Sequence, residues 1–137
     1  DLETYVKKNL KLDSNDVLDA SSPFLVNYLK VSGVLYEYLL LHPKSKMTPQ
    51  VLYWLALCDR SINYTFFFSL ADMYLQECIM EYPASPIAKQ CYKEYEEQTI
   101  AGYSGSSGTH LPAEVRSHLE GLKKMVDTGG KVDLNKQ

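Results

Sequence analysis

The segment from Gly102 to His110 gathers the residues whose types could do chemistry. Its glycines and serines precede a proline-opened helix, so free backbone N–H groups there could bind a phosphate or a carboxylate. Its hydroxyl and imidazole groups could also support nucleophilic or acid–base steps. The side chains of this candidate ligand loop are Tyr103, Ser106, Ser107, Thr109 and His110.

The same loop also fits a simple connector between packed helices. No lysine follows the glycines and we expect no strand before them, so the loop does not match a nucleotide-binding P-loop. A nucleophilic serine needs a base and an orienting carboxylate, and neighbours in sequence do not supply that geometry. We therefore name no catalytic residue, and both interpretations of residues 102–110 stay open.

Metal-ligating and redox-active side chains are few and dispersed. The three histidines lie too far apart for a helical i, i+4 ligand pair, at His42, His110 and His118. The three cysteines form no C-x-x-C pattern and fall on apolar helical faces, at Cys58, Cys78 and Cys91. We expect buried thiols, or one disulfide where two of them face each other across a hairpin. We expect no metal and no cofactor.

Prolines mark the elements that would position these residues. A Ser or Thr directly before proline starts a helix at Pro23, Pro49 and Pro86, because the hydroxyl caps the helix and proline fits its first turn. Pro43 and Pro83 end the helices before them. Adding the apolar periodicity of the other segments, we expect five helices, over roughly 23–42, 49–62, 65–82, 86–101 and 112–126.

No convincing period-two stretch interrupts these helices, so the sequence predicts an all-α fold of about five helices stacked as antiparallel hairpins. Residues 1–22 are expected to be a partly helical N-terminal segment, in which Leu2 and Val6 have helical spacing. Residues 23–127 are expected to form a helical-repeat domain, and residues 128–137 a flexible tail. The start at Asp1 suggests a processed or excised piece of a longer protein.

Composition disfavours two classes of partner. The 137 residues include 14 Lys and Arg against 17 Asp and Glu, a net charge of −3 without a basic stripe, so we expect no nucleic-acid binding. No apolar run approaches the roughly 20 residues that span a bilayer, so we expect no transmembrane segment. A hydrophobic content of 45% suits a folded domain rather than a disordered chain.

An internal repeat accompanies the prolines. A shift of about 40 residues superposes positions of the same kind: Pro43 on Pro83, Ser45 on Ser85, Leu35 on Leu75 and Leu39 on Ile79. A period of that length holds two helices, as in arrays where each hairpin buries its face against its neighbours.

The residues that carry this period resemble a tetratricopeptide repeat. The resemblance rests on residues 52–58, on Ala71, Leu75 and Cys78, and on the junction Tyr-Pro-Ala-Ser-Pro-Ile-Ala at 82–88. This junction is similar to those of bacterial envelope proteins of the same class. The resemblance covers residues 49–99 and, more weakly, 23–48. It implies a right-handed array of helical hairpins, a protein-binding role, and a periplasmic or envelope-associated location.

Surplus apolar surface is the second indication of a partner. The helices expected at 24–41 and 66–82 are hydrophobic almost all round, which is more than a domain of this size can bury. We predict an exposed groove for a peptide or partner helix, lined by Tyr28, Tyr36, Tyr53, Phe66, Phe67 and Tyr74. The alternative is that neighbouring segments cover this surface.

Together these patterns predict a non-enzymatic scaffold or adaptor domain that binds another protein or peptide, in a bacterial cell envelope. The alternative function is a small-ligand-binding or enzymatic helical domain that uses the loop at 102–110. The two differ in whether a polar pocket converges on His110.

Overall fold

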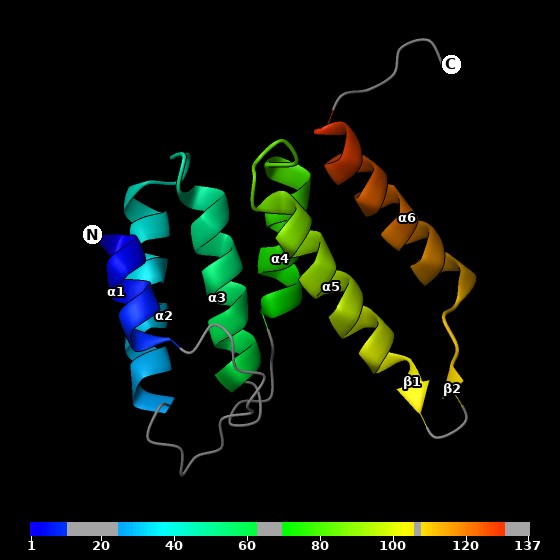
Figure 1. Ribbon diagram of the computed structural model, residues 1–137, viewed down its shortest axis with the longest axis horizontal. Coiled ribbons are helices and arrows are strands. Elements are labelled where there is room, and N and C mark those ends of the chain that lie inside the picture. Colours follow the sequence, from blue (N-terminus) through cyan, green and yellow to red (C-terminus); the bar gives the residue numbers. More distant parts are fainter. Residues whose placement is uncertain (11–24, 63–69, 106–107, 131–137) are drawn as a thin grey trace. The chain divides into compact units, whose positions relative to one another are not determined.

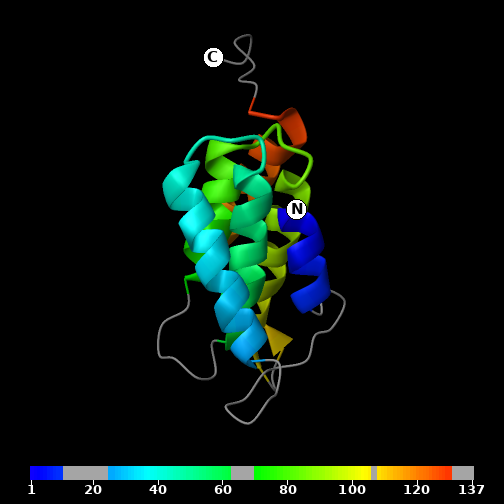
Figure 2. The same cartoon turned by 90° about the vertical axis from the view of Figure 1, so that its left-hand side faces the viewer.

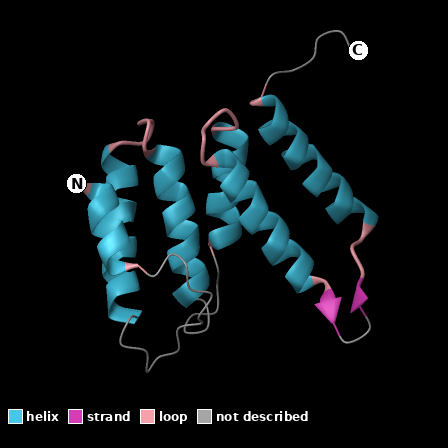
Figure 3. Cartoon of the chain, viewed as in Figure 1, coloured by secondary structure: helices cyan, strands magenta, loops and turns pink. Residues whose placement is uncertain are grey.

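The computed structural model describes residues 1–10, 25–62, 70–105 and 108–130, which contain six helices and one short β-hairpin (Figure 1). In chain order the elements are α1 (Leu2–Asn9), α2 (Leu25–Leu41), α3 (Thr48–Ile62), α4 (Ala71–Glu81), α5 (Ala88–Gly102), β1 (Ser104–Gly105), β2 (Gly108–Thr109) and α6 (Ala113–Thr128). The prediction of a mostly helical fold is confirmed, as the colouring of Figure 3 makes plain.

Leu2 and Val6, whose spacing is helical in the sequence, lie in α1. The Asp1 carboxylate accepts a hydrogen bond from the Thr4 backbone N–H at 2.8 Å and so caps the first turn of this helix. The strands β1 and β2 were not expected at all: Ser104 pairs with Thr109 and Gly105 with Gly108. Two residues per strand are too few to produce an alternating pattern.

The chain divides into two compact units, Asp1–Tyr74 and Leu75–Gln137, with the boundary inside α4. The expected single domain over 23–127 and the tail at 128–137 stay predictions. Within residues 1–74, α2 packs against both α1 and α3, and the three helices lie side by side in Figure 2. Within residues 75–137, α5 packs against α6.

The core of the first unit is centred on α3. All residues from Val51 to Cys58 are buried except Tyr53, which is half-buried. A helix that is apolar on most of its circumference is one that the fold surrounds. Between residues 26 and 41 of α2, the buried side chains are those of Tyr28, Val31 and Leu35, and these three share one face because they recur every three or four residues.

The start of α4 is capped by a side chain of another helix, α3. The carboxylate of Asp59, on α3, accepts hydrogen bonds from the backbone N–H groups of Leu70 at 2.5 Å and Ala71 at 3.0 Å. A carboxylate at this end also opposes the helix dipole. The helix expected from residue 65 therefore has its described start at Ala71, and residues 63–69 lie outside the described part of the chain.

In the second unit a disulfide joins α4 to α5, between Cys78 and Cys91, whose Cα atoms are 6.4 Å apart. The expectation of free thiols is therefore wrong for these two residues, and the alternative of one bridge across a hairpin is correct. Cys58 is a buried free thiol, as expected. The bridge could not be assigned from spacing because the cysteines form no recognisable pairing pattern.

The C-terminal end of α6 follows the sequence closely. Gly129 adopts a left-handed φ of 64°, and the Gly130 N–H bonds to the Met125 carbonyl at 2.8 Å, which together satisfy the last turn of the helix. A Cβ on Gly130 would lie 2.6 Å from Cγ of Pro83, so glycine is also required there by the close approach of the α4–α5 turn.

The turns after α2 and after α4 share three backbone hydrogen bonds, displaced by 40 residues. His42 N–H bonds to Tyr38 O, Thr48 N–H to Ser45 O, and Val51 N–H to Met47 O. The counterparts are Tyr82 to Cys78, Ala88 to Ser85, and Cys91 to Ile87. In each turn the serine Oγ also accepts the N–H of the residue two places on, Met47 or Ile87.

No helix within the described ranges has the combination of length and apolar character needed to cross a membrane.

Candidate functional site

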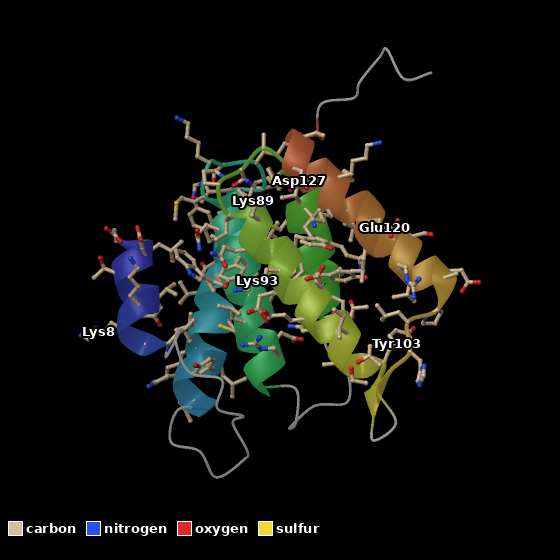
Figure 4. The ribbon with its side chains drawn as sticks, turned by 45° about the vertical axis from the view of Figure 1, so that its right-hand side comes forward. Lys8, Lys89, Lys93, Tyr103, Glu120 and Asp127 are labelled. Atoms are coloured by element: carbon tan, nitrogen blue, oxygen red, sulfur yellow. A yellow bond between two sulfur atoms is a disulfide. The ribbon has the colours of Figure 1, made fainter. Side chains whose placement is uncertain are left out.

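The described part of the candidate ligand loop contains the strands β1 and β2. Thr109 and His110 are exposed, and Tyr103 lies at the end of α5 with 43% of its surface exposed (Figure 4). The His110 N–H bonds to the Tyr103 carbonyl at 3.2 Å, and Ser104 Oγ lies 2.7 Å from Thr109 Oγ1. These bonds account for the hairpin itself. Ser106 and Ser107 lie outside the described residues.

His118 and His42 both contact neighbouring side chains. His118 Nε2 lies 3.2 Å from Gln76 Oε1, and its ring meets that of Tyr95 edge-on at 6.0 Å. The His42 ring lies against that of Tyr38, with centroids 4.8 Å apart and the two planes tilted by 42°. Over the ranges that the structure describes, no three His, Cys, Asp or Glu side chains gather where they could hold a metal ion.

Among the residues that the structure describes, Cys58 and Tyr92 have perturbed pKa values, and each shift has a structural cause. Burial raises the pKa of the Cys58 thiol to about 12, with a smaller contribution from the charge of Asp59. Burial also raises the pKa of Tyr92, followed by its 2.7 Å hydrogen bond to Glu96. The charges of Asp127 and Glu120, on α6 in Figure 4, act in the same direction. Neither group is activated as a nucleophile, because both shifts favour the protonated form.

The residues of the predicted groove do not share one environment. Tyr28 and Tyr74 are buried, with 6% and 7% of their surface exposed, and Tyr53 is half-buried. Tyr36 is 52% exposed. Phe66 and Phe67 lie outside the described residues. Of the described members, then, Tyr36 alone offers an open aromatic surface, and the groove as a whole stays a prediction.

A different apolar surface lies on α2, around Tyr36. Its side chains are between 43% and 68% exposed, and an exposed glycine stands among them. We call this surface the α2 stripe, and it consists of Val26, Leu29, Gly33, Tyr36 and Leu40.

The spacing of the α2 stripe places its members on one line along the helix. Their separations alternate between three and four residues, which is the spacing of a coiled-coil seam. At about 100° per residue, the line runs on the side of α2 roughly opposite the buried face of Tyr28, Val31 and Leu35. The stripe is thus an apolar face that the core of the first unit does not use.

The α2 stripe itself contains no charged residue, and its middle position has no side chain. Lys30 and Glu37 are exposed beside it, seven residues apart and therefore on the same edge. Gly33 lies at its middle, and a Cβ built there would meet no atom within 4 Å. Mid-helix glycine costs about 1 kcal/mol relative to alanine, and no contact with the described part of the chain requires it.

The sequence held the signal for the α2 stripe. The apolar residues of this helix cover its whole circumference, so periodicity alone does not say which face is buried. The three–four alternation centred on a glycine is the feature that separates the stripe from the core face. The predicted groove was chosen for its aromatic residues, so it included Tyr36 but not Leu29, Gly33 or Leu40.

No protein-family model, no curated protein and no solved structure matches this chain.

Proposed function

We propose that this chain is a non-enzymatic protein-binding domain that uses the α2 stripe to hold an α-helix of its partner. The observation that carries the proposal is the continuous apolar line of Val26, Leu29, Tyr36 and Leu40 on the solvent side of α2. A helix of complementary character can lay its own apolar side along such a line, with anchors at matching spacing. Exposed apolar area of this kind is uncommon on a surface without a partner.

The wider architecture in this proposal is an array of tetratricopeptide-like hairpins. Its support is the recurrence of one turn, with three backbone hydrogen bonds in common, after α2 and after α4. Helices α3 and α5 also have the same length and begin 40 residues apart, at Thr48 and Ala88. Domains of repeated hairpins commonly act as scaffolds through their helical surfaces.

An oxidising compartment belongs to the same proposal. Disulfides persist in secreted and periplasmic proteins and are rare in reducing compartments. The Cys78–Cys91 bridge therefore agrees with the envelope location implied by the resemblance. No observation of the described residues favours the alternative function at 102–110.

A photo-cross-linking scan tests the binding proposal. A benzoylphenylalanine is placed, one position at a time, at Leu29, Tyr36 and Leu40 of the full chain, produced in its native host. Val34 is the matched control, because it is an exposed apolar residue of the same helix that is rotated about 100° from Gly33. We expect adducts to one defined protein species from the three stripe positions and none from Val34.

The scan is paired with stripe variants that should leave the fold intact. Leu29→Glu and Leu40→Glu change exposed residues, so the helical circular dichroism should be unchanged while the adduct from Tyr36 disappears. Adducts that are equally strong from Val34, or absent from every stripe position, would show that the stripe is not the binding surface.

A further inference from the structure

We infer that the helix held by the α2 stripe is the α2 helix of a second copy of this chain, in an antiparallel pair. This inference rests on the proposed function, since it names the occupant of the same surface. A two-fold symmetric interface uses one patch twice, so the patch must be complementary to itself. The α2 stripe meets this requirement in its charge, its volume and its apolar residues.

Charge supplies the first argument. In an antiparallel pair related by a two-fold axis, an edge of one stripe lies beside the same edge of the other, with its order reversed. Lys30 and Glu37 lie on the same edge of the stripe and have opposite charge. Reversal therefore brings Lys30 of each copy beside Glu37 of the other, which makes two ion pairs from two residues.

Volume supplies the second argument. The alignment that pairs these charges also sets Gly33 opposite Tyr36 of the second copy, twice across the axis. Because a side chain at Gly33 would meet nothing within 4 Å, the surface is open there, and the half-exposed ring of Tyr36 can enter it. Glycine lets two backbones approach closely, and a large residue facing a small one fills the space between helices.

The apolar residues complete the seam on either side of this centre. In the same alignment Leu29 faces Leu40 of the second copy, so two leucine pairs flank the two Gly33–Tyr36 pairs. Both leucines are exposed in the single chain. A parallel pair would set Gly33 against Gly33 and Tyr36 against Tyr36, leaving a gap beside a crowded layer, and would leave Lys30 away from Glu37. The antiparallel pair is therefore the favoured one.

Sedimentation equilibrium of the full, oxidised chain over a concentration series tests the pairing. We expect the weight-average mass to rise from that of one chain toward that of two. Lys30→Glu and Glu37→Lys should each weaken association by about tenfold, since each converts two ion pairs into two repulsions. The double variant Lys30→Glu/Glu37→Lys restores opposite charges and should return within about threefold of the original.

Cysteine cross-linking tests the direction. Leu29→Cys and Leu40→Cys chains, mixed in a Cys58→Ala background and oxidised, should form a mixed disulfide between residues 29 and 40. Each variant alone should not, because its two cysteines would lie about 16 Å apart along the helix axis, beyond the reach of a disulfide. A Leu29–Leu29 type of product from the single variant would establish a parallel pair and overturn the inference.

The outcomes separate the two proposals. A chain that stays a monomer at every concentration, but whose stripe cross-links to another protein, overturns self-pairing and leaves the binding function standing. A monomer whose stripe gives no adduct overturns both. Self-association that survives both single charge reversals without loss would show that the copies meet through another surface, which also overturns the inference.

Discussion

The turns that follow α2 and α4 share three backbone hydrogen bonds but differ in the group that accepts the serine N–H. In the first, the buried Thr48 hydroxyl accepts the Ser45 N–H at 2.8 Å and donates to the His42 carbonyl at 3.1 Å. In the second, Ala88 replaces the threonine, and Ser85 N–H bonds directly to Tyr82 O at 3.0 Å. A hydroxyl relay and a direct bond thus close the same turn.

The side chains that join the two helices also differ between the first helical hairpin, α2–α3, and the second, α4–α5. Forty residues before Cys78 and Cys91 stand Tyr38 and Val51. Where the second hairpin has a covalent bridge, the first has Tyr38 OH at 2.9 Å from Ser45 Oγ, next to the His42 ring. The shared proline and serine thus determine the turn, while the link between the two helices can be a disulfide or a set of hydroxyl contacts.

Removing the disulfide should have the largest effect. A cross-link that closes a loop of this length stabilises a protein by about 3 kcal/mol, chiefly by restricting the unfolded chain. The Cys78→Ala/Cys91→Ala variant should therefore lose about that much unfolding free energy in urea titration. Tyr38→Phe, which removes only the hydroxyl of the first hairpin, should lose about 1 kcal/mol. Equal losses from the two changes would contradict the distinction drawn between the hairpins.

Alkaline pH should weaken the first hairpin through Cys58. Burial raises its pKa in the folded chain to about 12 from an ordinary value of 9.0. Above pH 9 the unfolded chain loses the thiol proton while the folded chain keeps it, so stability is complete below pH 9 and declines as pH rises toward 12. The expected slope is about 1.4 kcal/mol per pH unit.

Urea titrations between pH 8 and 11 measure that slope. The matched variant Cys58→Ala keeps the tyrosines and lysines that also titrate in this range, and the difference between the two proteins isolates the thiol. A difference that does not change with pH would show that Cys58 ionises in the folded chain.

At Thr48 we expect substitution by valine to destabilise the fold more than substitution by alanine, although valine keeps more of the side-chain volume. Thr48→Val keeps the volume but leaves Ser45 N–H and the His42 carbonyl without the hydroxyl, at a cost of about 2 kcal/mol. Thr48→Ala removes more atoms, yet it allows the direct bond that the second turn makes, and should cost about half as much. Thermal unfolding of both variants measures the order. Alanine being the worse substitution would indicate that packing, not the relay, is the role of Thr48.

These turns show what could be predicted from the sequence. The helix ends were readable because Pro43, Pro83 and Gly129 act on the residues directly beside them. The 40-residue shift in the sequence predicted that the two turns would be similar. Such signals are local, because proline and glycine limit the backbone conformations of the residues directly beside them.

The rest depended on contacts between residues far apart in sequence. Asp59 caps α4 from another helix, and Cys78 meets Cys91 across a turn. The burial of Tyr28 beside the exposure of Tyr36 depends on which side of α2 meets its neighbours. A helix that is apolar all round does not carry that information in its periodicity.

The smallest expected effect has the opposite sign. Position 98 in the second hairpin corresponds to Cys58 in the first, and there a glutamine is partly buried. Among the described residues, its Nε2 is the buried side-chain nitrogen without a hydrogen-bond partner. Gln98→Leu should therefore raise the unfolding free energy by about 1 kcal/mol, since a buried unpaired donor is costly. A loss of stability in thermal unfolding would mean that the amide is satisfied in solution.

The outer faces of α2 and α4 offer the most direct test of the central claim, which is that the α2 stripe is the binding surface. Leu40 and Met80 occupy corresponding positions and are 68% and 50% exposed, but the exposed Glu81 follows Met80 where Leu41 follows Leu40. Benzoylphenylalanine at each position, in otherwise identical full chains, compares the two faces under the same conditions. Our account predicts a defined protein adduct, with a second copy of the chain or another partner, from position 40 and none from position 80. Equal adducts from both, or an adduct from position 80 alone, would contradict it.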